Sequence, residues 1–197
     1  MSCSKCRSNV KCRCNIITCD ALLKCVAPYK DLMYLYFLRH GDALTQGYDD
    51  ASRPLSPLGE EEVKLATLTL KKLGVSLDAV LSSSLLRAKQ TAEIVLRELG
   101  IKKFIITEYL VPGTDSRQLI SELNELGKNS TLLVGHEPYL SSFISLLIGG
   151  SQATQIAMKK AGIACVESPV PIKSGNSVLR WLLSPEQMKH VDSSISK

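Results

Sequence analysis

The feature that most constrains this 197-residue chain is an apolar run at residues 32–38, LMYLYFL, that ends abruptly in Arg39-His40-Gly41. An unbroken apolar run of this length is typical of a short strand buried on both faces, as in the centre of an α/β sheet. A guanidinium and an imidazole are costly to bury without a partner, and a glycine lets the backbone turn sharply or approach a ligand. This ending indicates an oxyanion site, although a turn with a solvated arginine is the alternative for the pattern taken alone.

A second apolar run, residues 79–83, leads into a predicted helix that carries another arginine. Ser84 is the expected N-cap of this helix, so Arg87 falls in its first turn. A cation there opposes the helix macrodipole, and its presence makes better sense if the guanidinium and the free backbone N–H groups share an anion.

A third apolar run, residues 131–134, is followed by the sequence GHEP and a further helix, with Pro138 near the helix start. Two of the three histidines of the chain, His40 and His136, therefore stand where a strand gives way to the next element. The carboxyl ends of strands in an open α/β sheet border one ligand crevice. We therefore expect Arg39, His40, Arg87 and His136 to converge there.

The remaining segments alternate between helix and strand patterns. Ser56-Pro57 begins a predicted helix with an apolar stripe at helical spacing, and residues 42–53 have the composition of a loop. Further predicted elements are a strand at 104–107 leading to Glu108, a helix at 116–126, and two paired late strands at 163–166 and 178–183. Residues 185–197 are predicted to be a polar C-terminal tail with His190 on the surface.

Four stretches together resemble the histidine phosphatase superfamily, which contains phosphoglycerate mutases and acid phosphatases: LYFLRHGDA, RPLSPLGEEEV, LSSSLLRAKQTAEI and LLVGHEPYLSSFI. The short chain and the motifs RPLSPLG, GHEP and MKKAGIACVE are similar to the SixA-type phosphohistidine phosphatases. The resemblance covers residues 33–183. It implies a phosphoglycerate mutase-like α/β fold, a three-layer sandwich with a mostly parallel central sheet of about six strands flanked by helices. Only about 20 residues separate Glu108 from the GHEP strand, which leaves no room for a lid domain.

The resemblance also implies the roles of the site residues. His40 corresponds to the nucleophile that forms a phosphohistidine intermediate, and a neutral imidazole is a good nucleophile near pH 7. Arg39 and Arg87 can grip a phosphate bidentately, and His136, if protonated, adds a third positive contact. Gly41 and Asp42 are expected to border the bound substrate. We expect no metal and no other cofactor, because these side chains supply the positive charge that Mg²⁺ supplies in other phosphoryl-transfer enzymes.

The proton donor to the leaving group has two candidates. Glu108 follows the fourth predicted strand, where the superfamily usually places its donor, although the spacing from Glu108 to Gly113 differs from that of the mutases. Asp42, two residues after His40, is the competitor, and each could be a capping or surface carboxylate.

An open crevice without a lid suits a phosphorylated side chain on another protein. The prediction is therefore a phosphohistidine phosphatase acting on a histidine phosphotransfer domain or a histidine kinase. The alternatives are a small-molecule phosphomonoesterase or mutase-like enzyme, and a non-catalytic module that binds phosphoproteins.

Composition supports an ordinary globular domain, with 45% hydrophobic and 22% charged residues and apolar runs too short for a membrane span. Residues 1–32 contribute +4 of the net charge of +5, so the basic pI does not indicate a nucleic-acid surface on the folded domain. No membrane or nucleic-acid partner is expected, and the expected location is the cytoplasm.

Three segments are predicted: an N-terminal extension at 1–32, a histidine phosphatase domain at 33–184 and the polar tail at 185–197. The extension holds six of the seven cysteines. Its C-x-x-C and C-x-C spacings lack a second C-x-x-C or a histidine, so a metal site is not favoured. Met33 stands where members of the family commonly begin. The extension is therefore predicted to be disordered and dispensable, a translated upstream region or a non-native start.

Overall fold

The computed structural model describes residues 31–195, and the predictions for residues 1–30 lie outside the described residues. Its strands are β1 (Leu32–Arg39), β2 (Ala79–Ser82), β3 (Ile105–Ile106), β4 (Ser130–Gly135), β5 (Ile163–Pro169) and β6 (Val178–Leu183). Its helices are α1 (Pro57–Lys72), α2 (Leu86–Leu99), the short 3₁₀ helix η1 (Glu108–Leu110), α3 (Ser116–Leu126), α4 (Tyr139–Gly149) and α5 (Pro185–Ile195). In this described part of the chain, no helix combines the length and the apolar character needed to cross a bilayer.

The six strands form one sheet in the order β3-β2-β4-β1-β5-β6. The first four are parallel, β5 pairs antiparallel to β1, and β6 pairs antiparallel to β5. The predicted α/β fold with a mostly parallel sheet of about six strands is therefore confirmed, and the sheet is mixed because of β5. The two late strands pair with each other as the sequence pattern indicated.

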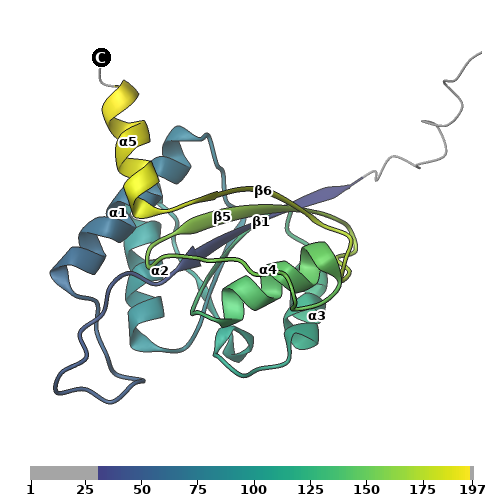
Figure 1. Ribbon diagram of the computed structural model, residues 1–197, viewed down its shortest axis with the longest axis horizontal. Coiled ribbons are helices and arrows are strands. Elements are labelled where there is room, and N and C mark those ends of the chain that lie inside the picture. Colours follow the sequence, from purple (N-terminus) through teal and green to yellow (C-terminus); the bar gives the residue numbers. More distant parts are fainter. Residues whose placement is uncertain (1–30, 196–197) are drawn as a thin grey trace, which may run out of the picture. The chain divides into compact units, whose positions relative to one another are not determined.

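Helices cover both faces of the sheet, which gives three layers (Figure 1). Alternate residues of β1 point to opposite faces, as Phe37 belongs to one apolar cluster and Leu38 to the other. The Phe37 cluster includes buried residues of α3 and α4, and the Leu38 cluster includes those of α1, α2 and α5. Burial on both faces, which the unbroken apolar run predicted, is confirmed at the carboxyl end of β1, where Phe37 and Leu38 lie. It is wrong at the other end, where Leu32 and Tyr34 are 39% and 37% exposed.

Local capping signals predicted one helix start and missed another. The Ser56 hydroxyl accepts a hydrogen bond from the Gly59 N–H at 3.1 Å, with Pro57 at the first helical position, as expected for α1. The Ser84 prediction is wrong, because the N-cap of α2 is Leu85, which makes no side-chain cap hydrogen bond. The Ser84 hydroxyl instead donates to the Glu108 carboxylate at 2.8 Å.

The two ends of the domain differ from the expected boundaries. Leu32 is already part of β1, where it pairs with Pro169, and the Asp31 carbonyl accepts a hydrogen bond from Val170. Residues 185–195, expected as part of a polar tail, form α5, whose Met188 is fully buried in the core. The exposed side chains among residues 185–190 are polar, and His190 is exposed as expected.

Two glycines allow the turn after β1 to lie against the start of α1. A Cβ on Gly41 would lie 2.6 Å from the Gly59 carbonyl oxygen, and a Cβ on Gly59 would overlap the backbone of Asp42. The backbones therefore approach each other more closely than any side chain allows. This contact places residues 40–42 directly beside the helix start.

Gly59→Ala is expected to destabilise the protein by about 2 kcal/mol or more, because the new methyl group has to push the Asp42 backbone away. Thermal unfolding followed by circular dichroism measures the effect. Glu61→Ala, an exposed position in the same helix, is the control and should leave the melting temperature almost unchanged. An equal melting temperature for Gly59→Ala and the control would contradict the close approach.

Candidate active site

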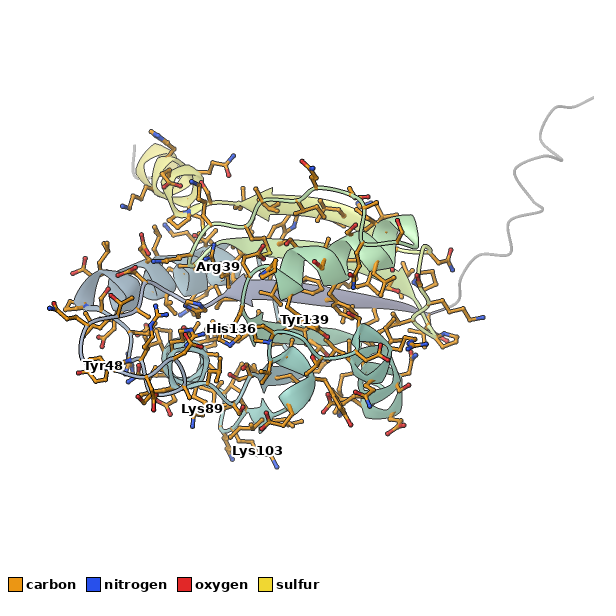
Figure 2. All side chains as sticks on the ribbon, turned by 60° about the horizontal axis from the view of Figure 1, so that its bottom comes forward. Arg39, Tyr48, Lys89, Lys103, His136 and Tyr139 are labelled. Atoms are coloured by element: carbon orange, nitrogen blue, oxygen red, sulfur yellow. The ribbon has the colours of Figure 1, made fainter. Side chains whose placement is uncertain are left out.

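Three neighbouring parallel strands end at the same level of the sheet and carry the predicted site residues just beyond their ends. Arg39 of β1 is in register with Gly135 of β4, and Ser82 of β2 is in register with Val134 of β4. The residues that follow are His40, His136 and Ser83. Figure 2 shows Arg39 and His136 beside this end of β1.

The His40 ring is held in one tautomer by its own turn. Its Nδ1 lies 2.7 Å from the Gly41 carbonyl oxygen. A carbonyl can only accept, so Nδ1 carries the proton and Nε2 presents a lone pair. The Nε2 atom accepts a hydrogen bond from Nε of Arg87 at 3.3 Å. The nitrogen needed for a nucleophile is therefore the one that faces the guanidinium.

Burial keeps the His40 imidazole uncharged. Only 7% of the residue is exposed, and desolvation lowers its pKa from 6.5 to about 4. The Gly41 carbonyl opposes this shift, whereas the nearby charges of Arg87, Arg39 and Lys160 reinforce it. At neutral pH the ring is consequently neutral, and its Nε2 lone pair becomes available for attack once the hydrogen bond from Arg87 turns to a ligand.

Arg87 reaches the site from the first turn of α2 and is 6% exposed. Two of its nitrogens bind Asp50 of the loop after β1: Nη1 donates to the backbone carbonyl at 2.5 Å, and Nη2 to the carboxylate at 3.2 Å. The Asp50 side chain itself is largely exposed. Asp50 therefore aligns the guanidinium so that its Nε points at His40.

His136 lies next to His40, with ring centroids 5.0 Å apart and ring planes inclined by 51°. Its Nε2 is 2.9 Å from the hydroxyl of Ser83, and its Nδ1 is buried without a hydrogen-bond partner. Desolvation, followed by the proximity of His40 and Arg87, lowers the His136 pKa to about 3. The unliganded site therefore holds a neutral His136, whereas the third positive contact expected from the sequence requires a protonated ring.

Arg39 is the last residue of β1 and directly precedes His40. Its Nη1 donates to the Met158 carbonyl at 2.8 Å, and its Nε is buried without a partner. Arg39 and Asp42 line a surface hollow of about 310 Å³ with Lys159 and Lys160. In the described residues, two of the four buried polar side-chain atoms without a partner thus belong to Arg39 and His136.

The two candidate proton donors have different environments. Asp42 accepts hydrogen bonds from Lys160 at 2.6 Å and from Ser56 at 2.7 Å, and these contacts hold the pKa of its carboxyl below the ordinary value. Asp42 is therefore a poor acid. Glu108 is exposed in η1, and one of its oxygens accepts the hydrogen bond from Ser84. Ser84 lies three residues before Arg87 in the sequence. Its hydrogen bond to Glu108 therefore brings Glu108 to the same edge of the sheet as Arg87.

Sequence reasoning missed three residues that orient the predicted site. Asp50 holds Arg87, Ser83 contacts His136, and Thr91 accepts a hydrogen bond from the Gly41 N–H at 3.3 Å. Thr91 lies one helical turn after Arg87, so periodicity could have placed it on the same face of α2. No sequence signal identified Asp50, because the loop that carries it has no periodic pattern.

Other reactive groups do not join this site. Cys165 of β5 is buried, and desolvation raises the pKa of its thiol to about 11. Among residues 31–195, no group of three or more His, Cys, Asp and Glu side chains is arranged to hold a metal ion.

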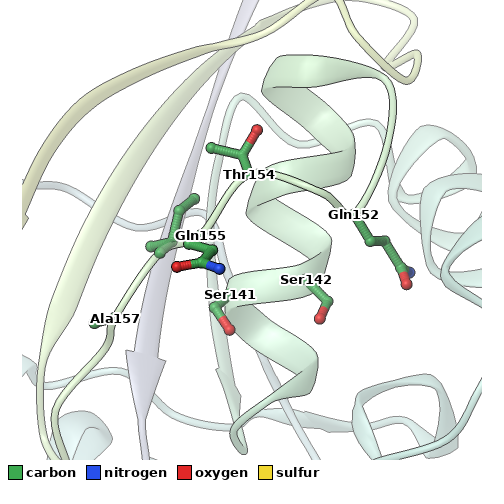
Figure 3. Close-up of a pocket in the computed structure, with 7 residues that line it drawn as sticks. Ser141, Ser142, Gln152, Thr154, Gln155 and Ala157 are labelled. Atoms are coloured by element: carbon green, nitrogen blue, oxygen red, sulfur yellow. The ribbon is translucent and has the colours of Figure 1, made fainter.

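A second, larger hollow of about 540 Å³ lies between α4 and residues 152–157 (Figure 3). Its lining is uncharged, with hydroxyl and amide groups such as Ser141, Thr154 and Gln155. Ser141 also donates to the carboxylate of Glu137, the neighbour of His136, at 2.6 Å. This hollow therefore borders the segment that carries His136, but it contains none of the predicted phosphate ligands.

The low pKa values of His40 and His136 predict that stability depends on pH. The unfolded chain binds protons on these imidazoles near pH 6.5, whereas the folded chain does so only near pH 4 and 3. Stability should be complete above about pH 6.5 and should decrease as the pH falls towards 4, by up to about 1.4 kcal/mol per histidine for each pH unit. Melting temperatures at pH 7 and pH 5 measure this. The decrease should be smaller in His136→Gln and unchanged in His190→Gln; equal decreases in all three proteins would contradict it.

Comparison with known proteins agrees with this geometry. The family model of the histidine phosphatase superfamily (branch 1) matches residues 35–111. The phosphohistidine phosphatase SixA of Escherichia coli is 32% identical over 162 residues, which span 80% of this chain and 97% of that protein. An uncharacterised protein of Picosynechococcus is 36% identical over 142 residues, 69% of this chain and 86% of that protein.

Solved structures show the same similarity. The structure of the protein histidine phosphatase SixA complexed with tungstate has a TM-score of 0.71 and 30% identity, covering 78% of this chain and 97% of that one. The alpha-ribazole phosphatase of Shigella flexneri, at 21% identity and a TM-score of 0.63, covers 78% of this chain and 97% of that one and shares the fold alone. The chain described here is therefore a hydrolase that belongs to the histidine phosphatase superfamily and is similar to SixA.

Proposed function

We propose that this protein is a phosphohistidine phosphatase that removes phosphate from a histidine on another protein, with His40 as the nucleophile. The observation that carries the proposal is the state of His40. The ring is buried and neutral and lies beside His136, its Nδ1 is tied to a carbonyl, and its unprotonated Nε2 accepts a hydrogen bond from Arg87 at 3.3 Å. A nucleophilic nitrogen next to donors for phosphate oxygens is the arrangement that phosphoryl transfer requires.

The reaction follows from these contacts in two steps. The Nε2 lone pair of His40 attacks the phosphorus while the P–N bond of the substrate breaks. If the other ring nitrogen of the substrate already carries a proton, the substrate leaves as a neutral imidazole. Water then attacks the phosphorus of phosphorylated His40, and inorganic phosphate leaves with both protons of that water. His40 returns to its neutral form.

The buried donors of Arg39 and His136 are suited to the phosphoryl oxygens in both steps. Arg39 Nε and His136 Nδ1 lack protein partners, and buried polar groups in native proteins normally have one. Arg87, whose Nε is 3.3 Å from His40 Nε2, would complete the set. The binding of tungstate, a tetrahedral oxyanion, to the related SixA supports an oxyanion at this position.

A protein substrate is favoured by access and by leaving-group chemistry. The loop that carries Asp50 is exposed, and the segment from η1 to β4 contains α3 without a lid domain. A phosphohistidine side chain could therefore reach His40 while still attached to its own domain. A neutral imidazole is also an easier leaving group than an alkoxide, which suits a site where Asp42 is held in its ionised form.

A substrate comparison tests the proposal. The full chain is assayed on a ³²P-phosphorylated histidine phosphotransfer domain, on 3-phosphoglycerate and on an aryl phosphate. We expect the highest kcat/KM on the phosphorylated domain, with an acid-labile phosphate transiently bound to the enzyme. A higher kcat/KM on the small esters would assign the protein to small-molecule hydrolysis instead. Stoichiometric binding of the domain without release of phosphate would indicate a non-catalytic module.

Glu108→Gln is expected to change turnover of the phosphorylated domain by less than about threefold, because the imidazole leaving group needs no acid. Hydrolysis of an alkyl phosphate should fall by about 10²-fold, the typical contribution of a general acid. Glu125→Gln, an exposed position on α3, is the control. A 10²-fold loss on the phosphorylated domain would contradict the leaving-group argument and assign an acid role to Glu108.

A further inference from the structure

The hydrogen-bond partners of the Ser83 hydroxyl indicate which ring nitrogen of His136 carries the proton. The burial of His136 alone does not indicate this. Ser83 directly follows β2, is fully buried, and is held by a backbone hydrogen bond from its N–H to the Val134 carbonyl. Its hydroxyl oxygen accepts a hydrogen bond from the Leu85 N–H at 3.4 Å. The other contact of this hydroxyl is with Nε2 of His136 at 2.9 Å.

The direction of this contact follows from the chemistry of a buried hydroxyl. A hydroxyl has one proton to donate, and leaving that proton without an acceptor in the interior is costly. Leu85 N–H is a donor, so it cannot accept the proton. Among the described residues this leaves Nε2 of His136 as the acceptor. A neutral imidazole that accepts at Nε2 carries its own proton at Nδ1.

The proton at Nδ1 is then in an unusual position. His136 is 2% exposed, and its Nδ1 has no hydrogen-bond partner in the described part of the chain. Its ring contacts His40, whose Nε2 is the proposed point of phosphoryl attachment. An N–H there lacks an acceptor unless a ligand brings one, and a phosphoryl oxygen is such an acceptor.

We propose that Ser83 is a positioning residue that holds His136 in the Nδ1–H tautomer, so that a neutral His136 donates a hydrogen bond to the phosphoryl group. This role rests on the proposed function, because it assumes a phosphoryl group at His40. Preorganised donors of this kind stabilise a transition state without reorientation during the reaction. Without the hydroxyl, the proton can move to Nε2 and leave a lone pair facing the phosphoryl oxygens.

Nitrogen NMR measures the tautomer directly and needs no substrate. The full chain is labelled with ¹⁵N-histidine, and long-range ¹H–¹⁵N correlations at pH 7 identify which ring nitrogen of each histidine carries the proton. With three histidines in the chain, His136→Gln and His190→Gln assign the signals. We expect the Nδ1–H form for His136 in the unaltered protein. The Nε2–H form there would overturn the proposal even if Ser83→Ala did not fold.

Ser83→Ala and Ser82→Ala form a matched pair. Ser82 is also fully buried, but its hydroxyl donates to the Ser83 carbonyl at 3.1 Å and does not contact His136. Ser83→Ala should shift His136 towards the Nε2–H form and lower kcat about tenfold with little change in KM, the loss expected for one hydrogen bond. Ser82→Ala should change neither.

The outcomes separate this inference from the proposed function. An unchanged His136 tautomer in Ser83→Ala, or a changed tautomer with unchanged kcat, would overturn the role of Ser83. Addition of inorganic phosphate to the unaltered protein should shift the Nδ1 resonance of His136, and an unaffected resonance at saturating phosphate would also contradict it. Failure to hydrolyse a phosphorylated histidine domain would instead refute the proposed function, whatever the tautomer.

Discussion

His40→Ala is expected to abolish turnover, with a decrease in kcat of at least about 10⁴-fold, because it removes the proposed nucleophile that forms the covalent intermediate. The only other imidazole in contact with it, His136, has its Nε2 occupied by Ser83. Steady-state hydrolysis measures the loss of turnover. Quench-flow detection of acid-labile, alkali-stable phosphate on the enzyme measures the loss of covalent labelling. Both the turnover and the label should be lost together.

His190→Ala is the matched control, since His190 is exposed on α5 and remote in sequence from the strand ends. It should retain full activity and full labelling. Melting curves establish that His40→Ala is folded. Retention of more than about a tenth of the activity in a folded His40→Ala protein would show that the nucleophile is another group or a water molecule.

The second large effect is expected for Arg87→Ala, which should lower kcat/KM by about 10²- to 10³-fold, the cost of removing one oxyanion donor from a preorganised site. The Arg87 guanidinium is buried, and its Nε donates a hydrogen bond to His40 Nε2, the proposed nucleophile. Arg87→Lys should recover little activity, because an ammonium cannot bind Asp50 with two nitrogens while a third faces His40.

Arg97→Ala is the control for this prediction, because Arg97 lies on the same helix with a largely exposed side chain. It should have the kcat/KM of the unaltered protein. Binding of tungstate, measured by calorimetry, should weaken in Arg87→Ala and remain unchanged in Arg97→Ala. Unchanged tungstate binding in Arg87→Ala would remove Arg87 from the phosphate site.

In the unliganded site, Asp50 binds the Arg87 nitrogens that are expected to bind phosphate. In this state the Asp50 carboxylate binds Arg87 at 3.2 Å, where Nη2 could otherwise contact a phosphoryl oxygen. Arg87 is also held by the Asp50 carbonyl, and this backbone contact does not depend on the side chain. The loop after β1 is therefore part of the site in the folded protein, although its sequence has the character of an ordinary surface loop.

The sequence predicted the parts of the fold that depend on neighbouring residues. The apolar runs that became β1, β2 and β4, and the Ser56-Pro57 start of α1, are signals that act within a few residues. The C-terminal helix α5 was missed because four of the six residues at 185–190 are polar and exposed. Met188 contributes to the core while the residues next to it are exposed, and so the pattern resembles a polar tail.

The sequence by itself determined which residue types stand at the ends of the strands: the arginine and histidine after β1, the arginine that opens α2 and the histidine after β4. Only the tertiary structure decided their partners and protonation. Asp50 is 37 residues from Arg87, Ser83 is 53 from His136, and Met158 is 119 from Arg39. Such contacts depend on the register of β1, β2 and β4 and on the burial that this register creates, and no local pattern specifies either.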